Sequence, residues 1–153
     1  MHFFTKPRLI SWFLLSMIAG ALFFSYMSGP RQERTLLYFQ RYNGELGVEE
    51  RYIPTLPGQD LAVTLIHELL LGPADRDFLH LTDPEVQPRS CFVRGNALYV
   101  DLPAHALTPQ TKTPDFYTVY TLLQKNITTN CKNITGIYLY INGTPAYAKH
   151  PGA

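Results

Sequence analysis

The chain has 153 residues, of which 46% are hydrophobic and 16% charged, and its formal net charge at pH 7 is +1. Two of its 13 basic residues, Lys6 and Arg8, lie in the first thirty, so the remainder carries 11 Lys and Arg against 12 Asp and Glu. This balance excludes the basic surface with which proteins bind nucleic acid or anionic lipid.

The first thirty residues contain a long apolar segment, with no side chain from 9 to 30 that is ionised at neutral pH. At about 1.5 Å per helical residue it spans roughly 33 Å, enough to cross the hydrocarbon core of a bilayer. We predict that residues 9–29 enter the membrane, either as a retained anchor or as a cleaved signal. Lys6 and Arg8 favour an N-terminus in the cytoplasm, with residues 31–153 outside.

Turn residues and hydrophobic spacing divide residues 31–153 into short elements. In chain order, the predicted elements are strands 35–39 and 50–54, a helix over 61–71, strands 91–94 and 97–102, a helix over 114–127, and strands 137–141 and 144–148. The order ββαββαββ predicts a single α+β domain, in which one sheet carries two helices on one face.

Turn and capping signals set several of these boundaries. Asp60 precedes the first helix and Gly72-Pro73 follows it, as is usual at helix ends. Gly95-Asn96 predicts a tight hairpin between strands 91–94 and 97–102. Thr113 followed by Pro114 predicts the start of the second helix.

Alternation along two predicted strands separates an aliphatic face from an aromatic one. The aliphatic set, which should meet the helices, comprises Leu98, Val100, Leu102, Ile137, Leu139 and Ile141. The opposite face carries Tyr99, Tyr138 and Tyr140, joined by Tyr147. These tyrosines are either a partner-binding surface or ordinary strand residues under a loop, and the sequence leaves both interpretations open.

Three segments resemble the GerMN domain: LAVTLIHELLLGP at 61–73, CFVRGNALYVDLP at 91–103, and GIYLYINGTP at 136–145. Their order and spacing cover nearly the whole of residues 31–153, beyond the membrane segment at 1–30. The resemblance implies a non-enzymatic module of bacterial sporulation, germination and envelope proteins, which helps to assemble protein complexes. The apolar segment and the basic residues before it predict a single-pass protein of the bacterial cytoplasmic membrane with its domain on the periplasmic side.

Cys91 and Cys131 lie in the part predicted to be extracytoplasmic, where disulfides persist. The sequence leaves open whether they pair or remain two buried thiols.

No pattern of catalytic, metal-binding or cofactor-binding residues emerges. His67-Glu68 starts like a helical zinc site, but Leu71 stands where the second histidine is required. Asp101 and His105 are four residues apart but straddle Pro103. Asn126, Asn133 and Asn142 each begin a glycosylation sequon, which we interpret as helix-end and turn chemistry. We predict no catalytic residue, no metal and no cofactor.

Two functions from different classes follow. The first is a membrane-anchored module that presents the tyrosine face or an edge strand to a partner ectodomain or to another copy of itself. The second is a binding module for a small ligand such as a wall glycan, with Tyr99, Tyr138 and Tyr140 as stacking platforms. At most roughly 17 Å of extended chain over residues 29–33 would join the anchor to the first strand, which keeps the domain near the membrane.

Overall fold

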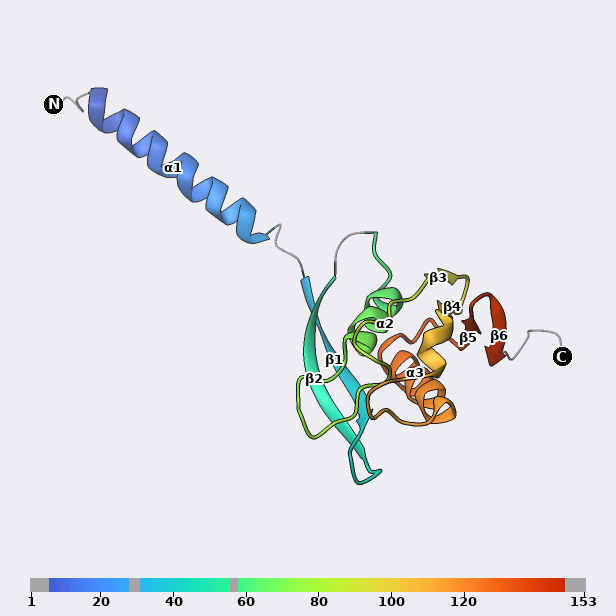
Figure 1. The fold of residues 1–153 in the computed structure, drawn as a ribbon. Helices are drawn as coiled ribbons and strands as arrows, with labels where there is room; N and C mark the ends of the chain where they lie inside the picture. The colour runs from blue at the N-terminus through green and yellow to red at the C-terminus, as the bar shows by residue number, and fades with distance from the viewer. Residues whose placement is uncertain (1–5, 28–30, 56–57, 148–153) are drawn as a thin grey trace. The chain divides into compact units, whose positions relative to one another are not determined.

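The computed structural model describes residues 6–27, 31–55 and 58–147 (Figure 1). The chain divides into two compact units, residues 1–31 and residues 32–153. The elements, in order, are α1 (Lys6–Met27), β1 (Arg31–Gln40), β2 (Leu46–Thr55), α2 (Leu61–Leu71), β3 (Ser90–Arg94), β4 (Ala97–Leu102), the 3-10 helix η1 (Ala104–Leu107), α3 (Phe116–Asn130), β5 (Gly136–Ile141) and β6 (Thr144–Tyr147).

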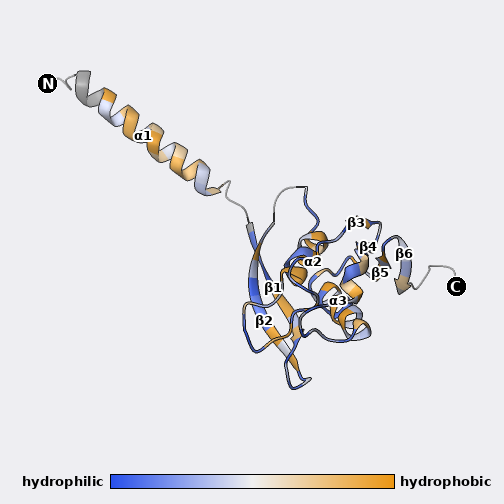
Figure 2. Cartoon of the chain, viewed as in Figure 1, coloured by the Kyte–Doolittle hydropathy of each residue, from blue (hydrophilic) through white to orange (hydrophobic). Residues whose placement is uncertain are grey.

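The first unit contains the helix α1, which is mostly apolar beyond its basic start (Figure 2). Its stretch Ile10–Met27 is long and apolar enough to cross a membrane, by length and composition. A signal sequence near an N-terminus meets the same criterion. The structure is therefore compatible both with a retained anchor and with a cleaved signal.

The second unit contains two sheets where the sequence predicted one. β1 and β2 form a two-stranded sheet, and the other strands form a four-stranded sheet of order β3-β4-β5-β6. In the larger sheet β3 and β4 are antiparallel, β4 and β5 parallel, and β5 and β6 antiparallel. Strand alternation determines which face a residue takes but not which strand lies beside it, so the division into two sheets was missed.

The hairpin of β1 and β2 is longer than predicted because its turn starts the pairing early. The amide of Arg41 donates to the carbonyl of Glu45 at 2.7 Å, and Gly44 donates back to Arg41 at 2.9 Å. Gly44 has a φ of +89°, which glycine adopts without steric cost. Two strands of ten residues each extend from this turn, so that Gln40 lies opposite Leu46 and Leu36 opposite Glu50.

One hydrophobic core joins the hairpin, the two helices and the four-stranded sheet. Figure 1 shows α2 and α3 between the hairpin and the larger sheet. All six aliphatic residues predicted to face the helices from β4 and β5 are buried. α3 begins two residues later than the predicted helix over 114–127 and ends three residues later, at Asn130. Its start is set by the side chain of Asp115, which caps the helix by accepting from the amide of Thr118 at 3.0 Å.

Two asparagines of α3 bond to the backbone of β1 as a neighbouring strand would. Asn126 accepts from the amide of Tyr38 at 2.7 Å and donates to its carbonyl at 2.9 Å. One helical turn later, Asn130 makes the same pair of bonds to Leu36, at 3.0 and 2.9 Å. Four helical residues rise about 6.0 Å and two strand residues about 6.6 Å, so the two repeats match. Asn126 is completely buried, and its sequon therefore serves this contact.

Arg51 of β2 holds the C-terminal end of α2. Its guanidinium donates to the carboxylate of Glu49 at 2.5 Å, to the carboxylate of Glu68 at 3.1 Å and to the carbonyl of Gly72 at 2.7 Å. Carbonyls at a helix C-terminus lack partners within the helix and carry partial negative charge. A cation from the hairpin satisfies that end, which links the smaller sheet to α2.

Candidate functional site

Three aromatic side chains form a row across the face of the four-stranded sheet that points away from the helices. Phe92 of β3 lies directly opposite Tyr99 of β4, which lies opposite Tyr138 of β5. The Phe92 and Tyr99 ring centroids are 5.2 Å apart with planes 9° apart, and those of Tyr99 and Tyr138 are 4.9 Å and 12° apart. We call Phe92, Tyr99 and Tyr138 the aromatic row.

The structure brings together two of the four tyrosines that the sequence selected. Tyr99 and Tyr138 stack in the aromatic row, while Tyr140 lies two residues further along β5, opposite Asp101. The side chain of Tyr147 lies outside the described residues. Sequence reasoning missed Phe92, although the predicted hairpin about Gly95-Asn96 was enough to pair it with Tyr99.

Exposure falls along the aromatic row. Phe92 is 48% exposed and Tyr138 is 8% exposed, with Tyr99 half-buried between them. Burial raises the pKa of the Tyr138 hydroxyl, and its tyrosine neighbours add to the effect. The rings stack on one another, so the central ring, Tyr99, has a neighbouring ring on each side.

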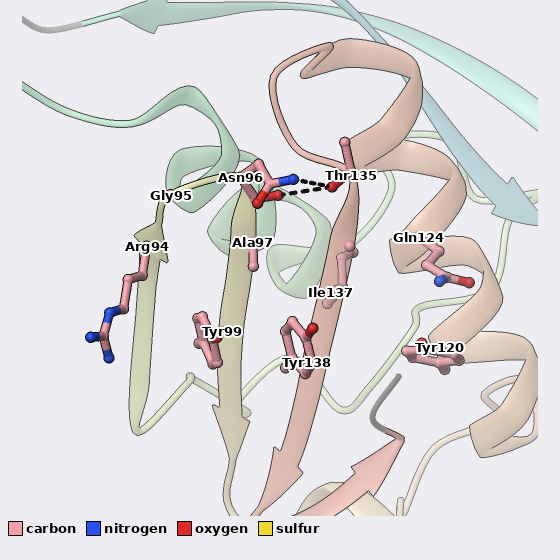
Figure 3. Close-up of a pocket in the computed structure, with 11 residues that line it drawn as sticks. Arg94, Gly95, Asn96, Ala97, Tyr99, Tyr120, Gln124, Thr135, Ile137 and Tyr138 are labelled. Carbon is pink, nitrogen blue, oxygen red and sulfur yellow. Dashed lines mark hydrogen bonds between the residues drawn. The ribbon is translucent and has the colours of Figure 1, made fainter. Parts of the chain in front are cut away.

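A cavity of about 490 Å³ lies beside the aromatic row, where the β3–β4 turn, the start of β5 and α3 approach one another (Figure 3). Its lining includes Arg94, Asn96, Tyr99, Tyr120, Gln124 and Tyr138. Asn96 binds Thr135 through its side chain at 2.6 Å and through its carbonyl, which accepts from the Thr135 amide at 2.9 Å. The turn and the start of β5 are therefore held together as one wall of the cavity.

Asp101, on the same face as the aromatic row, is held by structural contacts. Its carboxylate accepts from the amide of Gly143 at 2.9 Å and lies 3.4 Å from the guanidinium of Arg89. Arg89 also donates to the side chain of Asn142 at 2.6 Å. These bonds fix the turn between β5 and β6. Asp101 thus belongs to a turn-binding network, and none of its recorded bonds within the described residues involves His105.

The remaining polar candidates from the sequence lie apart. Glu68 is bound by Arg51, as described above, while His67 is exposed on α2. No three His, Cys, Asp or Glu side chains converge on a common point within residues 6–27, 31–55 and 58–147. The arrangement in and around the aromatic row provides contact area and neutral hydrogen-bonding groups, which are the requirements of recognition.

Cys91 and Cys131 are free thiols in the structure. Cys91 lies on β3 and Cys131 follows the last residue of α3. Burial raises the pKa of Cys91 to about 12 and is the main cause that raises the pKa of Cys131 to about 11. Because the thiolate is the reactive form, burial keeps both sulfurs inert at neutral pH.

We expect the folded chain to resist thiol modification at pH 7.5, and both cysteines to react once it is unfolded. The measurement is mass spectrometry after brief treatment with a maleimide, with and without denaturant. Two modified thiols in denaturant without reductant would match the structure. If the unfolded chain took up the reagent only after reduction, the cysteines would be paired instead.

Comparisons with known proteins identify the family. The family model described as sporulation and spore germination, Germane, matches residues 36–147, which is most of the chain. The chain belongs to the Germane family. The resemblance to the GerMN domain that the sequence motifs indicated is confirmed.

Two structures and one curated relative are similar to this Germane chain. The tandem GerMN domains of the sporulation protein GerM from Bacillus subtilis superpose with a TM-score of 0.58 at 15% identity, covering 74% of this chain and 40% of that one. The first GerMN domain of the same protein gives 0.57 at 16% identity, covering 74% and 85%. At these identities the likeness shows the fold alone. An uncharacterised lipoprotein of Treponema pallidum (strain Nichols) is 36% identical over 83 residues, which are 54% of this chain and 62% of the relative.

Proposed function

We propose that this protein is attached to the bacterial cytoplasmic membrane by its N-terminal segment and that its GerMN-type domain binds a protein partner outside the cytoplasm. The apolar helix α1 and the similarity to a lipoprotein support membrane attachment. The N-terminus would lie in the cytoplasm, as the basic residues before the segment favour. The domain would act by binding, without catalysis, in the envelope or in a sporulation-type complex.

The observation that carries this proposal is the aromatic row, with Phe92 as its exposed end. Aromatic side chains are enriched at the centres of protein interfaces, because they supply a large contact area at low entropic cost. Phe92 stacks on the half-buried Tyr99 ring, and this contact limits the orientations open to it. A pre-ordered apolar side chain on a sheet face is suited to insertion into a pocket of another protein.

The same geometry argues against wall glycan as the ligand of the aromatic row. A sugar ring stacks on the face of an aromatic ring, which must lie open to solvent. Here the faces of Tyr99 are turned toward Phe92 on one side and Tyr138 on the other. The tyrosine platform that the second hypothesis requires is therefore not available on the central ring.

The test is crosslinking in cells with the full-length, C-terminally tagged chain, followed by solubilisation, pull-down and mass spectrometry. We expect a recurrent envelope protein, with its yield reduced about tenfold or more by Phe92→Ala, as at an interface hot spot. The matched control is Leu107→Ala, since Leu107 is also 48% exposed but lies on η1.

Equal capture by the Phe92 variant and the control variant would contradict the role of the aromatic row. If Phe92→Ala retained the protein partner but lost binding of wall fragments, the result would instead favour the glycan hypothesis. Recovery of the tag in a soluble extracytoplasmic fraction would show that the N-terminal segment is cleaved.

A further inference from the structure

The two outer edges of the β1–β2 hairpin differ in how many of their backbone groups are hydrogen-bonded. Along the outer edge of β1, the amides and carbonyls of Leu36 and Tyr38 are bound by Asn130 and Asn126. At the next position on this edge, the carbonyl of Gln40 accepts from the amide of Leu79 at 2.8 Å. Both backbone groups of Leu36 and Tyr38 and the carbonyl of Gln40 are thus hydrogen-bonded, so this edge is closed along the half of β1 nearest the turn.

The outer edge of β2 lacks such partners. Since Leu36, Tyr38 and Gln40 point their backbone groups away from β2, the residues opposite them in an antiparallel pair point theirs away from β1. With the register set by the turn, β2 has four outward residues that carry an amide hydrogen, Leu46, Val48, Glu50 and Tyr52, and these are followed by Pro54 near the end of the strand. Within the described residues, no recorded hydrogen bond occupies the backbone groups of these four on that edge.

The side chains on this edge do little to discourage pairing. Leu46, Val48 and Tyr52 are 49%, 51% and 60% exposed, respectively. Glu50 is the one charged outward side chain of the four, and its carboxylate already lies 2.7 Å from the guanidinium of Arg34. Proteins usually protect a long edge strand with unpaired charges, proline or a covering segment. On this edge Pro54 lies only at the end of β2, and the stretch from Leu46 to Tyr52 is left as a site for an added strand.

We propose that β2 pairs with β2 of a second copy of this chain, in antiparallel orientation, to make a four-stranded sheet across two molecules. The proposal goes beyond the partner binding of the aromatic row and is independent of it, because β2 belongs to the other sheet. In a two-fold symmetric dimer the same edge of both copies forms the interface, so β2 can pair with β2 of the second copy. Attachment of both copies to one membrane raises their effective concentration.

The residues on the edge select one register. With Leu46 opposite Tyr52 and Val48 opposite Glu50 of the second copy, all four outward residues form hydrogen-bonded pairs, about eight backbone bonds in total. Pro54, which has no amide hydrogen, falls outside this ladder. Shifting the strands by two residues would place Glu50 opposite Glu50 and bring Pro54 into the ladder. The first register avoids both costs, and it places Glu49 opposite Glu49 of the second copy, where each carboxylate is already bound by Arg51 of its own chain.

The experiment uses full-length chains carrying two different tags, co-expressed in the membrane. One chain carries Val48→Cys and the other Glu50→Cys, and the cells are treated with a mild oxidant. Residues in a hydrogen-bonded antiparallel pair have Cα atoms about 5.5 Å apart, within disulfide reach. We expect a disulfide-linked dimer that carries both tags, with a yield at least fivefold above that of chains carrying Leu107→Cys. The Leu107→Cys chains measure the crosslinking that random encounters between membrane-attached copies produce.

A second variant separates pairing from folding. Leu46→Pro, placed in both chains, removes one outward amide hydrogen at the first residue of β2, where proline is tolerated. We expect it to lower the crosslink yield at least fivefold and to leave the unfolding temperature within a few degrees.

Three results would overturn the proposal. The first is a yield equal to the Leu107→Cys control. The second is a dominant disulfide between two Glu50→Cys chains, which reports the other register. The third is capture of a different protein at Val48→Cys. Phe92→Ala should leave the dimer intact, so failure of the aromatic row and failure of this interface are distinguishable.

Discussion

Replacing Asn126 with alanine is expected to destabilise the domain by about 2–4 kcal/mol. The substitution removes the bonds to the amide and carbonyl of Tyr38 and a third bond, at 2.8 Å, from the Asn126 side chain to the carbonyl of Leu122. A buried donor or acceptor left without a partner costs about 1–3 kcal/mol. Loss of the bonds to Tyr38 would also detach β1 from α3 at its centre.

The measurement is chemical denaturation of the full-length chain in detergent, followed by the fluorescence of the domain tyrosines. The control is Asn133→Ala, because Asn133 begins the other Asn-Ile-Thr sequon but is exposed. That variant should stay within about 0.5 kcal/mol of the parent, as surface substitutions usually do. Equal losses in the two variants would mean that the bonds to β1 contribute nothing.

Replacing Gly72 with alanine is expected to be at least as damaging, with a loss of about 3 kcal/mol or more. Gly72 has φ +97° and ψ 179°, a region that is essentially restricted to glycine and costs other residues about 1–3 kcal/mol. A Cβ there would also lie 2.1 Å from Nδ1 of the His80 ring. Overpacking of this kind adds roughly 1–3 kcal/mol, and displacement of Gly72 would disturb its bond from Arg51.

Two other glycines separate strain from steric clash. At Gly95, with φ +63°, an added Cβ meets nothing within 4 Å, so Gly95→Ala tests backbone strain alone. Gly136 has equally open space without a positive φ, and Gly136→Ala should be nearly neutral. We expect thermal unfolding to rank the losses as Gly72, then Gly95, then Gly136. If Gly72→Ala lowered the unfolding temperature no more than Gly95→Ala, the His80 side chain would be moving aside to relieve the contact.

The parts of the fold that follow from local chemistry were predictable from the sequence. Gly95-Asn96 paired β3 with β4, and Gly72 ended α2 at the predicted residue. The α+β class and the inward aliphatic face of β4 and β5 also follow from hydrophobic period alone. These features depend on neighbours within a few residues, which a single sequence displays directly.

The division into two sheets and the asparagine contacts depend on residues far apart in the chain. Asn126 and Tyr38 are separated by 88 positions, and nothing near either residue indicates the other. A signal was nevertheless present, because Asn126 lies on the buried stripe of α3 between Leu122 and Ile127. A polar side chain on an apolar stripe needs a hydrogen-bonding partner, and the sequon pattern led to a helix-end interpretation instead.

The candidate site divides in the same way. Tyr99 and Tyr138 were assigned correctly to one face by alternation, and the registers then place them side by side. The stacking of their rings, on which our proposal of a protein partner rests, required the parallel pairing of β4 with β5. That pairing joins strands that are separated in the chain by α3, so it could not be predicted from a hairpin turn.

The double attachment of β1 has a mechanical consequence. β1 is the first element after the membrane segment, so tension transmitted through a retained anchor enters the domain at this strand. It is bonded to β2 on one side and to Asn126 and Asn130 on the other. Force directed along the strand would load these bonds in shear and together, so that several must break at once. With the anchor retained, as we propose, this arrangement would let the domain keep its shape under such force.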